Sequence, residues 1–142
     1  MSVELISQCS DELVDAMARL LPQLSSSGKA LSVEETAALV EQDCLKLFVF
    51  RTDDGVIEGM LSLILFKIPT GLRAWIEDVV VSEATRGQGA GQKLVEAATS
   101  YATEVGARTV DLTSRPTREA ANRLYQRCGF VKRETNVYRF SH

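Results

Sequence analysis

The chain has 142 residues, of which 45% are hydrophobic and 25% are charged, and its net charge is −3. This length fits one domain, and the composition excludes disordered, collagen-like and disulfide-rich proteins. A pI of about 5.2 argues against a nucleic-acid-binding protein, which would carry a clustered basic patch. We therefore expect a single globular domain over residues 1–142.

The first half of the chain predicts two helices followed by a β-hairpin. Ser10 and Ser32 each precede residues with helical apolar spacing, so both are expected to cap helices, with Pro22 near the end of the first. Asp53-Asp54-Gly55 is a turn signal. The other expected elements are a short strand at 3–7, a loop over 23–30 that includes the run 25–28, and hairpin strands at 45–51 and 56–68.

The second half alternates strands and helices. Residues 75–82 predict a strand, and Val79-Val80-Val81 is apolar on both faces, as in a central strand covered on both sides. A helix is expected from the following glycines to Gly106, and Pro116 opens another. Strands at 109–113 and a final strand pair over 129–140 complete the pattern. This order predicts one mixed sheet flanked by helices.

The turn Arg86-Gly87-Gln88-Gly89-Ala90-Gly91 lies between a predicted strand and a predicted helix. Glycines allow unusual backbone angles and close ligand approach, and the first N–H groups of a helix are free to bind an anion. A dinucleotide motif would need glycine at Gln92, and a nucleotide-triphosphate motif fails because Leu94 follows Lys93. The turn predicts a diphosphate site, unless the glycines serve only tight packing in an interaction domain.

These features resemble the GNAT superfamily of N-acetyltransferases from about Trp75 to Phe130. Arg86, Gly89 and Gly91 match the family signature [RQ]-x-x-G-x-[GA], and the block from Asn122 to Phe130 resembles the family's second motif. The resemblance implies an α/β (α+β) fold. It has a mixed, mostly antiparallel sheet of about six or seven strands, about four flanking helices, and a splay between the fourth and fifth strands.

The resemblance also implies how coenzyme A would bind. The backbones of Val79 and Val81 would bond the pantetheine arm as an added strand would. Arg86 and the N–H groups of the turn would hold the pyrophosphate, and Asn122 would contact the cofactor from the later helix. The turn residues concerned are Gly87, Gln88, Gly89, Ala90 and Gly91.

Acyl transfer to an amine needs a proton acceptor for the amine and a proton donor for the leaving thiolate. By resemblance, Tyr125 is the candidate acid, because a phenol with a pKa near ~10 stays protonated. Its alternative is a ring buried for packing with a bonded hydroxyl. Glu77 is the candidate base, although it could instead bind a cationic substrate or form a salt bridge. Strand alternation puts Glu77 and Asp78 on opposite faces, so only one would reach the slot.

We therefore expect an acyl-CoA-dependent N-acyltransferase. It would transfer the acetyl group of acetyl-CoA to a primary amine of a small molecule or peptide by direct attack in a ternary complex. The alternative is a non-catalytic acyl-CoA-binding or regulatory module. The single histidine, His142, leaves no histidine triad or metal site, so no metal is expected. The acidic first half favours a cationic acceptor, and an exposed last strand could support a homodimer.

Compartment is inferred from cysteines and hydropathy. Cys9, Cys44 and Cys128 are far apart and form no CxxC pair, which is typical of reduced thiols in the cytosol. Apolar runs fall well short of the ~20 residues that cross a bilayer, and Met1 opens no leader-like segment. The sequence thus predicts a cytoplasmic protein without a membrane partner.

Overall fold

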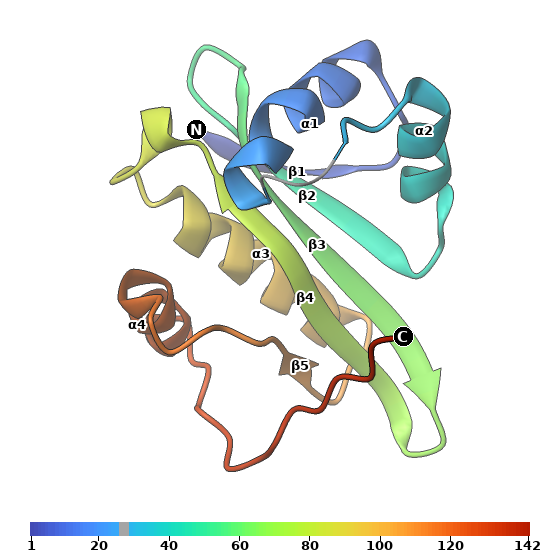
Figure 1. The fold of residues 1–142 in the computed structure, drawn as a ribbon, viewed down its shortest axis with the longest axis vertical. Helices are drawn as coiled ribbons and strands as arrows, with labels where there is room; N and C mark the ends of the chain where they lie inside the picture. Colours follow the sequence, from blue (N-terminus) through green and yellow to red (C-terminus); the bar gives the residue numbers. More distant parts are fainter. Residues whose placement is uncertain (26–28) are drawn as a thin grey trace.

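The computed structural model describes residues 1–25 and 29–142. Among them, five strands form one mixed sheet in the order β1-β2-β3-β4-β5, antiparallel except for the parallel pair β4–β5. Figure 1 shows the sheet running through the molecule with helices on both sides. The strands are β1 (Ser2–Ile6), β2 (Leu45–Arg51), β3 (Ile57–Ile68), β4 (Gly71–Val81) and β5 (Val110–Asp111).

Four α-helices and one 3-10 turn occur in the described ranges. The helices α1 and α2 start with the expected serine caps, whereas α4 begins at Glu119 rather than at the expected Pro116. The Ser10 hydroxyl accepts from the Leu13 N–H, and Ser32 forms a reciprocal capping box with Glu35. The helices are α1 (Asp11–Leu24), α2 (Val33–Glu41), α3 (Ala90–Glu104) and α4 (Glu119–Arg127), and the 3-10 turn is η1 (Glu83–Thr85).

The predicted loop over 23–30 is wrong at its start, because α1 continues through Pro22 to Leu24. Proline lacks only its own N–H, and near a helix end its cost is small compared with the apolar face that α1 buries. The rest of that prediction, at residues 26–28, lies outside the described residues.

The apolar core is divided into two clusters by the sheet. One cluster joins the sheet to α1 and α2, and includes Leu13, Leu20 and Val80. The other joins the sheet to α3 and α4, and includes Phe50 and Leu94. Both faces of β2, β3 and β4 are therefore covered, as the triple valine predicted, and the resulting burial is the main stabilising term for the fold.

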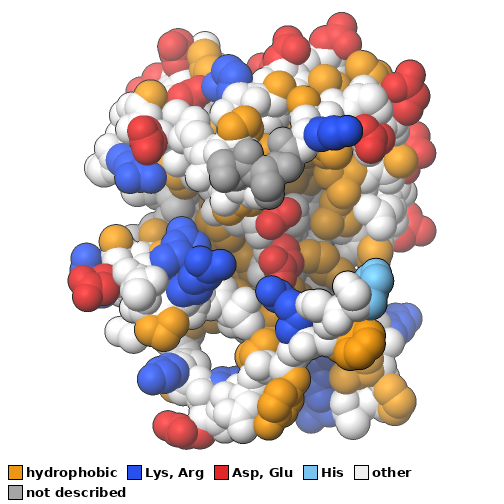
Figure 2. Space-filling view, viewed as in Figure 1, with side chains coloured by type: hydrophobic (Ala, Val, Ile, Leu, Met, Phe, Trp, Pro, Cys, Tyr) orange, Lys and Arg blue, Asp and Glu red, His pale blue; other side chains and the backbone are white. Residues whose placement is uncertain are grey.

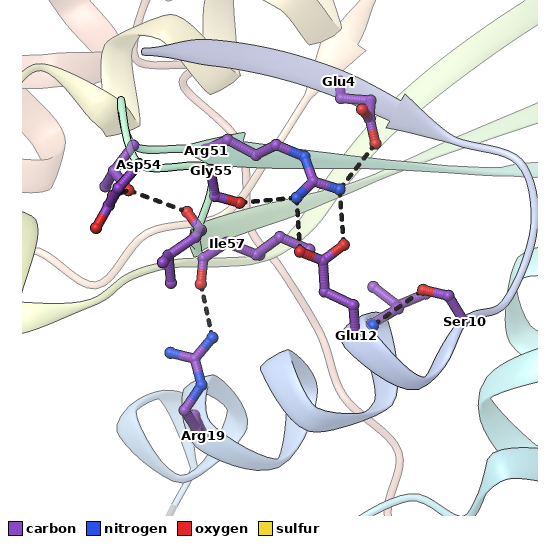
Figure 3. A network of polar contacts seen from close by, with 11 residues as sticks. Glu4, Ser10, Glu12, Arg19, Arg51, Asp54, Gly55 and Ile57 are labelled. Carbon is purple, nitrogen blue, oxygen red and sulfur yellow. Dashed lines mark hydrogen bonds and ion pairs between the residues drawn. The ribbon is translucent and has the colours of Figure 1, made fainter.

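A polar network fixes α1 to the β2–β3 hairpin (Figure 3). The Arg51 guanidinium donates to both Glu12 carboxylate oxygens at 2.7 and 2.9 Å, and also to the Gly55 carbonyl at 2.9 Å. A longer bond of 3.3 Å reaches Glu4 on β1. This pairing raises the pKa of Arg51 and holds that of Glu12 below its usual range. One side chain therefore connects two strands, the hairpin turn and a helix.

The expected count of six or seven strands is wrong, because the predicted strand pair over 129–140 does not form. The chain from Val131 onward has no strand or helix, and each of its residues is exposed. Strand-forming composition is not sufficient, because a strand needs an edge with which to pair.

The expected splay lies between β4 and β5. These strands pair only at Ala74 with Val110 and at Trp75 with Asp111, although β4 continues for six more residues to Val81. The predicted strand over 109–113 is correspondingly reduced to residues 110 and 111. The edge of β4 beyond Trp75 is therefore open on this side. No helix in the described ranges combines the length and apolar character that a membrane crossing requires.

Candidate active site

The glycine turn begins where β4 ends. The Ser82 hydroxyl accepts from the Ala84 N–H at 3.3 Å, and the Ser82 carbonyl accepts from the backbone N–H and the hydroxyl of Thr85, which forms η1. The chain then passes through Gly87 and Gly89, whose φ angles are +86° and +76°. Only glycine adopts these angles without strain, and Gly89 is the residue that precedes the first turn of α3.

Most amide hydrogens of this turn are free, although the N–H groups of Arg86 and Gln88 donate to the Glu83 and Thr85 carbonyls at 3.4 and 3.3 Å. No acceptor in the described residues takes the N–H groups of Gly87, Gly89, Ala90, Gly91 or Gln92. The next N–H along the chain, that of Lys93, donates to the Gly89 carbonyl at 3.1 Å and starts the helical pattern. A side chain added at Gly87 or Gly89 would meet nothing within 4 Å, so the space beside these residues is open. The turn can therefore accommodate an anion in contact with its backbone.

Gly91 has a different role from the other two glycines. A Cβ atom there would lie 3.0 Å from Leu124 Cδ1, so this glycine allows α3 to pack closely against α4. The packing explanation of the glycines thus holds for Gly91, whereas positive φ explains Gly87 and Gly89. Arg86 leaves its guanidinium 72% exposed, with only a 3.9 Å contact to Glu83, so its charge is available to a ligand.

The open edge of β4 presents backbone groups next to this turn. The Ser82 N–H donates to the Glu58 carbonyl on β3 at 2.7 Å, and Val80 lies opposite Met60. Because bonded positions alternate along an antiparallel pair, Val81 points its N–H and C=O away from β3. They face the other edge of β4, where β5 no longer pairs with it. Val79 lies two residues earlier on the same edge. An extended ligand could pair with this edge as a strand would.

Between Val79 and Glu77 the strand contains a β-bulge. The register jumps from Met60–Val80 to Ser62–Glu77, and Asp78 has φ +52°, the only positive value at a non-glycine among the described residues. Ile76 packs toward α3, and after the bulge Val79 does too. The alternation across residues 76–79 is therefore broken, so it no longer decides which of Glu77 and Asp78 reaches the slot, and that choice stays a prediction.

The two carboxylates at the bulge differ in their surroundings. The Trp75 indole Nε1–H donates to Glu77 Oε1 at 2.7 Å, which holds that exposed carboxylate in place. Burial raises the pKa of the Asp78 carboxyl, and the negative charge of Glu77 raises it further. The two groups are therefore close enough to interact. Sequence reasoning did not identify Asp78 as a candidate site residue, because no local signal marks an aspartate that will occupy a β-bulge.

Tyr125 lies on α4 with its ring buried in the α3 side of the core, at 6.0 Å from the Phe130 ring centre. Its hydroxyl has no partner in the described residues, and it is not sealed from solvent. Burial raises the pKa of this phenol, an effect only partly offset by Arg118. The alternative of a hydroxyl tied to the backbone does not apply. The phenol is thus protonated at neutral pH and free to donate.

Two further residues lie at the start of α4. The Asn122 amide Nδ2 donates to the Arg115 carbonyl at 3.0 Å, so this side chain fixes the loop before α4 and leaves its oxygen for other contacts. Ser114, in the stretch after β5, has an enclosed hydroxyl without a hydrogen-bond partner. Enclosed hydroxyls without partners are uncommon, and this donor has no acceptor among the described residues.

Figure 2 shows the face of the molecule that contains the splay. Acidic side chains lie in a hollow at the middle of this face, between the part with α1 and α2 and the part with α4 and the last residues of the chain. Basic side chains border the hollow. The described residues contain no group of three or more histidine, cysteine, aspartate or glutamate side chains that could hold a metal ion.

The fold and the site together define a class. A mixed α+β sheet with a splay next to the start of a helix is the architecture of an acetyltransferase fold. The chain belongs to the GNAT acetyltransferase family, whose sequence profile matches residues 13–130. This confirms the resemblance found in the sequence.

Solved structures agree with this assignment. A candidate acetyltransferase from Agrobacterium tumefaciens is 26% identical, with a TM-score of 0.87 over 99% of this chain and 100% of that one. An aminoglycoside acetyltransferase from an uncultured soil metagenomic sample, solved with sisomicin, is 20% identical with a TM-score of 0.85, over 99% and 95%. Glucosamine-6-phosphate N-acetyltransferase from Arabidopsis thaliana is 22% identical with a TM-score of 0.77, over 99% of each chain. No protein of curated function matches the sequence.

Proposed function

We propose that this chain is an acyl-CoA-dependent N-acyltransferase that transfers the acetyl group of acetyl-CoA to a primary amine. The observation that carries the proposal is the turn 86–91, where four backbone N–H groups, those of Gly87, Gly89, Ala90 and Gly91, lack acceptors in the described residues at the start of α3. Such amides, the positive end of the helix dipole and the exposed Arg86 suit a pyrophosphate. The family membership supports the same donor.

The donor would occupy the splay. Its diphosphate would be held by Arg86 and by the amides of Gly87, Gly89, Ala90 and Gly91, with the Gln88 backbone in the same turn. Its extended arm would pair with the free edge of β4 at Val79 and Val81. Asn122 would contact it from α4 through the oxygen that the Arg115 bond leaves free. When bound, acetyl-CoA supplies an activated thioester carbonyl.

The chain's own residues would manage the protons. The amine nitrogen forms a bond to the acetyl carbon, and the bond from that carbon to sulfur breaks. Glu77 takes the proton that the nitrogen loses, directly or through water, and the Tyr125 hydroxyl gives a proton to the departing sulfur. The indole bond from Trp75 orients Glu77, and the raised pKa of Tyr125 keeps its proton in place until the thiolate develops.

The acceptor would be an amine on a small molecule or a peptide. Acidic side chains in the hollow of Figure 2, together with Glu77 and Asp78 at the bulge, favour a cationic acceptor such as a polyamine, a lysine side chain or an aminoglycoside. The structural neighbour that binds sisomicin is consistent with that class.

Titration of coenzyme A into purified variants tests the donor site. Arg86→Ala removes one charge-assisted donor worth about 1.5–3 kcal/mol, so the dissociation constant should rise roughly 10- to 150-fold. Gly89→Val strains the backbone at φ +76° and fills the open space, so binding should be lost. Gly106→Val is the matched control, because Gly106 has φ +91° and equal space at the other end of α3. If all three variants bind alike, the turn does not hold the cofactor.

Turnover separates an enzyme from a binding module. Thiol release from acetyl-CoA is measured across a panel of polyamines, lysine peptides and aminoglycosides. Tyr125→Phe should lower kcat by roughly 10²-fold or more while coenzyme A affinity stays unchanged, because only the proton donor is removed. Stoichiometric cofactor binding without turnover on any amine would instead identify the non-catalytic acyl-CoA-binding module.

A further inference from the structure

The short 3-10 turn η1 supports the start of the glycine turn. The N–H groups of Arg86 and Gln88 donate to the carbonyls of Glu83 and Thr85, at 3.4 and 3.3 Å. In the part of the chain that the structure describes, no other backbone hydrogen bond anchors residues 86–88. The position of these residues therefore depends on the position of η1.

The start of η1 is capped by two distant parts of the chain. The first N–H groups of a helix have no acceptor within the helix itself. Ser82 accepts two of them, since its hydroxyl takes the Ala84 N–H at 3.3 Å and its carbonyl takes the Thr85 N–H at 3.0 Å. The Glu83 N–H instead donates to Oε1 of Gln23 at 3.2 Å. This acceptor comes from α1, 60 residues earlier in the chain.

Gln23 lies on a part of α1 that is fastened to the sheet. Arg19 precedes it by one helical turn, so the two side chains leave the same face of the helix. The Arg19 guanidinium donates to the Ile57 carbonyl at 2.9 Å, the bond drawn in Figure 3, and to Glu58 Oε1 at 2.7 Å. The Glu58 carbonyl accepts the Ser82 N–H at 2.7 Å. This face of α1 therefore contacts the starts of β3 and η1 together.

We infer that Gln23 is a positioning residue for the donor site. By accepting the Glu83 N–H, it fixes η1 and, through the Glu83 carbonyl, the backbone of Arg86. The inference rests on the proposed function and adds to it a residue from α1, outside the signature of the turn.

The turn needs such support because of its glycines. Gly87 and Gly89 both have positive φ, and glycine loses more conformational freedom on ordering than any other residue. A turn that is already ordered before the ligand arrives binds that ligand at a smaller entropic cost. Gln23 therefore raises the affinity for the diphosphate without touching it, by keeping the turn in its binding conformation.

Titration of coenzyme A into variants at this position tests the role. Gln23→Met keeps the length of the side chain and removes the acceptor, so the dissociation constant should rise roughly 2- to 10-fold, as for one neutral hydrogen bond. Gln23→Glu keeps an acceptor and should stay within about twofold of the wild type once added salt screens its charge. Gln42→Met is the matched control, because the Gln42 side chain donates to the Leu39 carbonyl at the end of α2. It should bind coenzyme A as the wild type does.

Steady-state constants distinguish this role from a place in the acceptor site or in the chemistry. In Gln23→Met, the KM for acetyl-CoA should rise, while kcat and the KM for the amine stay unchanged, because only the donor site is less ordered. A rise confined to the amine KM would place Gln23 at the acceptor. A fall confined to kcat would place it in the chemical step. Either result would overturn the inference.

Amide exchange in the cofactor-free protein shows whether η1 responds to the change. The Glu83 N–H should exchange faster in Gln23→Met than in the wild type or Gln42→Met, because it has lost its acceptor. Weaker binding with unchanged exchange would mean that Gln23 touches the cofactor itself, against the inference. Equal binding of coenzyme A by the wild type and Gln23→Met would overturn the inference and leave the proposed function intact. A wild-type chain that does not bind coenzyme A would contradict both.

Discussion

Two carboxylates at the bulge of β4 illustrate how one backbone angle changes the chemistry of neighbouring side chains. Asp78 has φ +52°, a value that costs most residues energy but that aspartate and asparagine tolerate better than others. Burial and the charge of Glu77 both raise its pKa. The folded protein therefore favours the protonated form of Asp78 more strongly than the unfolded chain does.

The sign of this effect predicts how stability depends on pH. A carboxyl whose pKa is raised on folding penalises the fold as pH increases from the ordinary value of 3.8 to the raised value, and the full penalty applies above it. Asp78→Asn removes the charge and retains tolerance of positive φ. Its melting temperature at neutral pH should equal or exceed that of the wild type, and any gain should disappear at about pH 3.

A comparison with valine separates charge from backbone strain. Asp78→Val has a β-branched side chain at positive φ and should destabilise the fold by about 1–3 kcal/mol at every pH. Thermal melts of the three proteins across pH give the answer. If asparagine is as harmful as valine, the carboxylate itself makes a stabilising contact, and our account of Asp78 is wrong.

At the scale of elements, the Arg51 guanidinium joins the start of α1 to the hairpin, and the Arg19 guanidinium adds a second link to β3. Arg51 binds Glu12 through two parallel bonds, and Figure 3 shows Glu4 and the Gly55 carbonyl around the same group. Lysine is a point charge and cannot reproduce this planar, forked geometry. A lysine at position 51 would therefore keep the charge but lose the paired bonds to Glu12.

Arg51→Lys should lower the melting temperature by about 2–4 °C at pH 7. The pKa of Glu12 is depressed, so its contribution is present above the ordinary glutamate value and lost as pH falls through the lowered one. The gap between wild type and variant should accordingly close in acid. Arg73→Lys is the control, because Arg73 bonds only to threonine hydroxyls. Equal effects of both changes would show that the carboxylate network adds nothing.

Elements with local signals were predicted well from the sequence. The serine caps gave the starts of α1 and α2, the Asp53-Asp54-Gly55 turn gave the hairpin, and the glycines gave the start of α3. The bulge at Asp78 had no such signal. The length of β5 and the pairing of residues 129–140 also failed, because both depend on what lies beside the strand rather than on its composition.

At the scale of the whole molecule, the proposed site is assembled from parts that are far apart in the sequence. The turn, the edge of β4 and the Tyr125 phenol come from three elements, and the sequence predicted these residues through family motifs. Sequence could not show which amides would lack acceptors or that the Tyr125 hydroxyl would lack a partner, because both depend on tertiary packing. The same holds for the contact by which Gly91 brings α3 against α4.

The short seam between β4 and β5 has a consequence for motion. It is fastened by two register pairs and by flanking bonds from Ala74 to Thr109 and from Arg108 to Leu72, whereas β2 is paired with β3 along its full length. Deuterium should therefore enter the amides of this seam sooner than those at the centre of β3, since local opening there breaks few contacts. A donor bound in the gap between β4 and β5 would slow this deuterium uptake. Local opening is therefore expected at the place proposed to bind the donor.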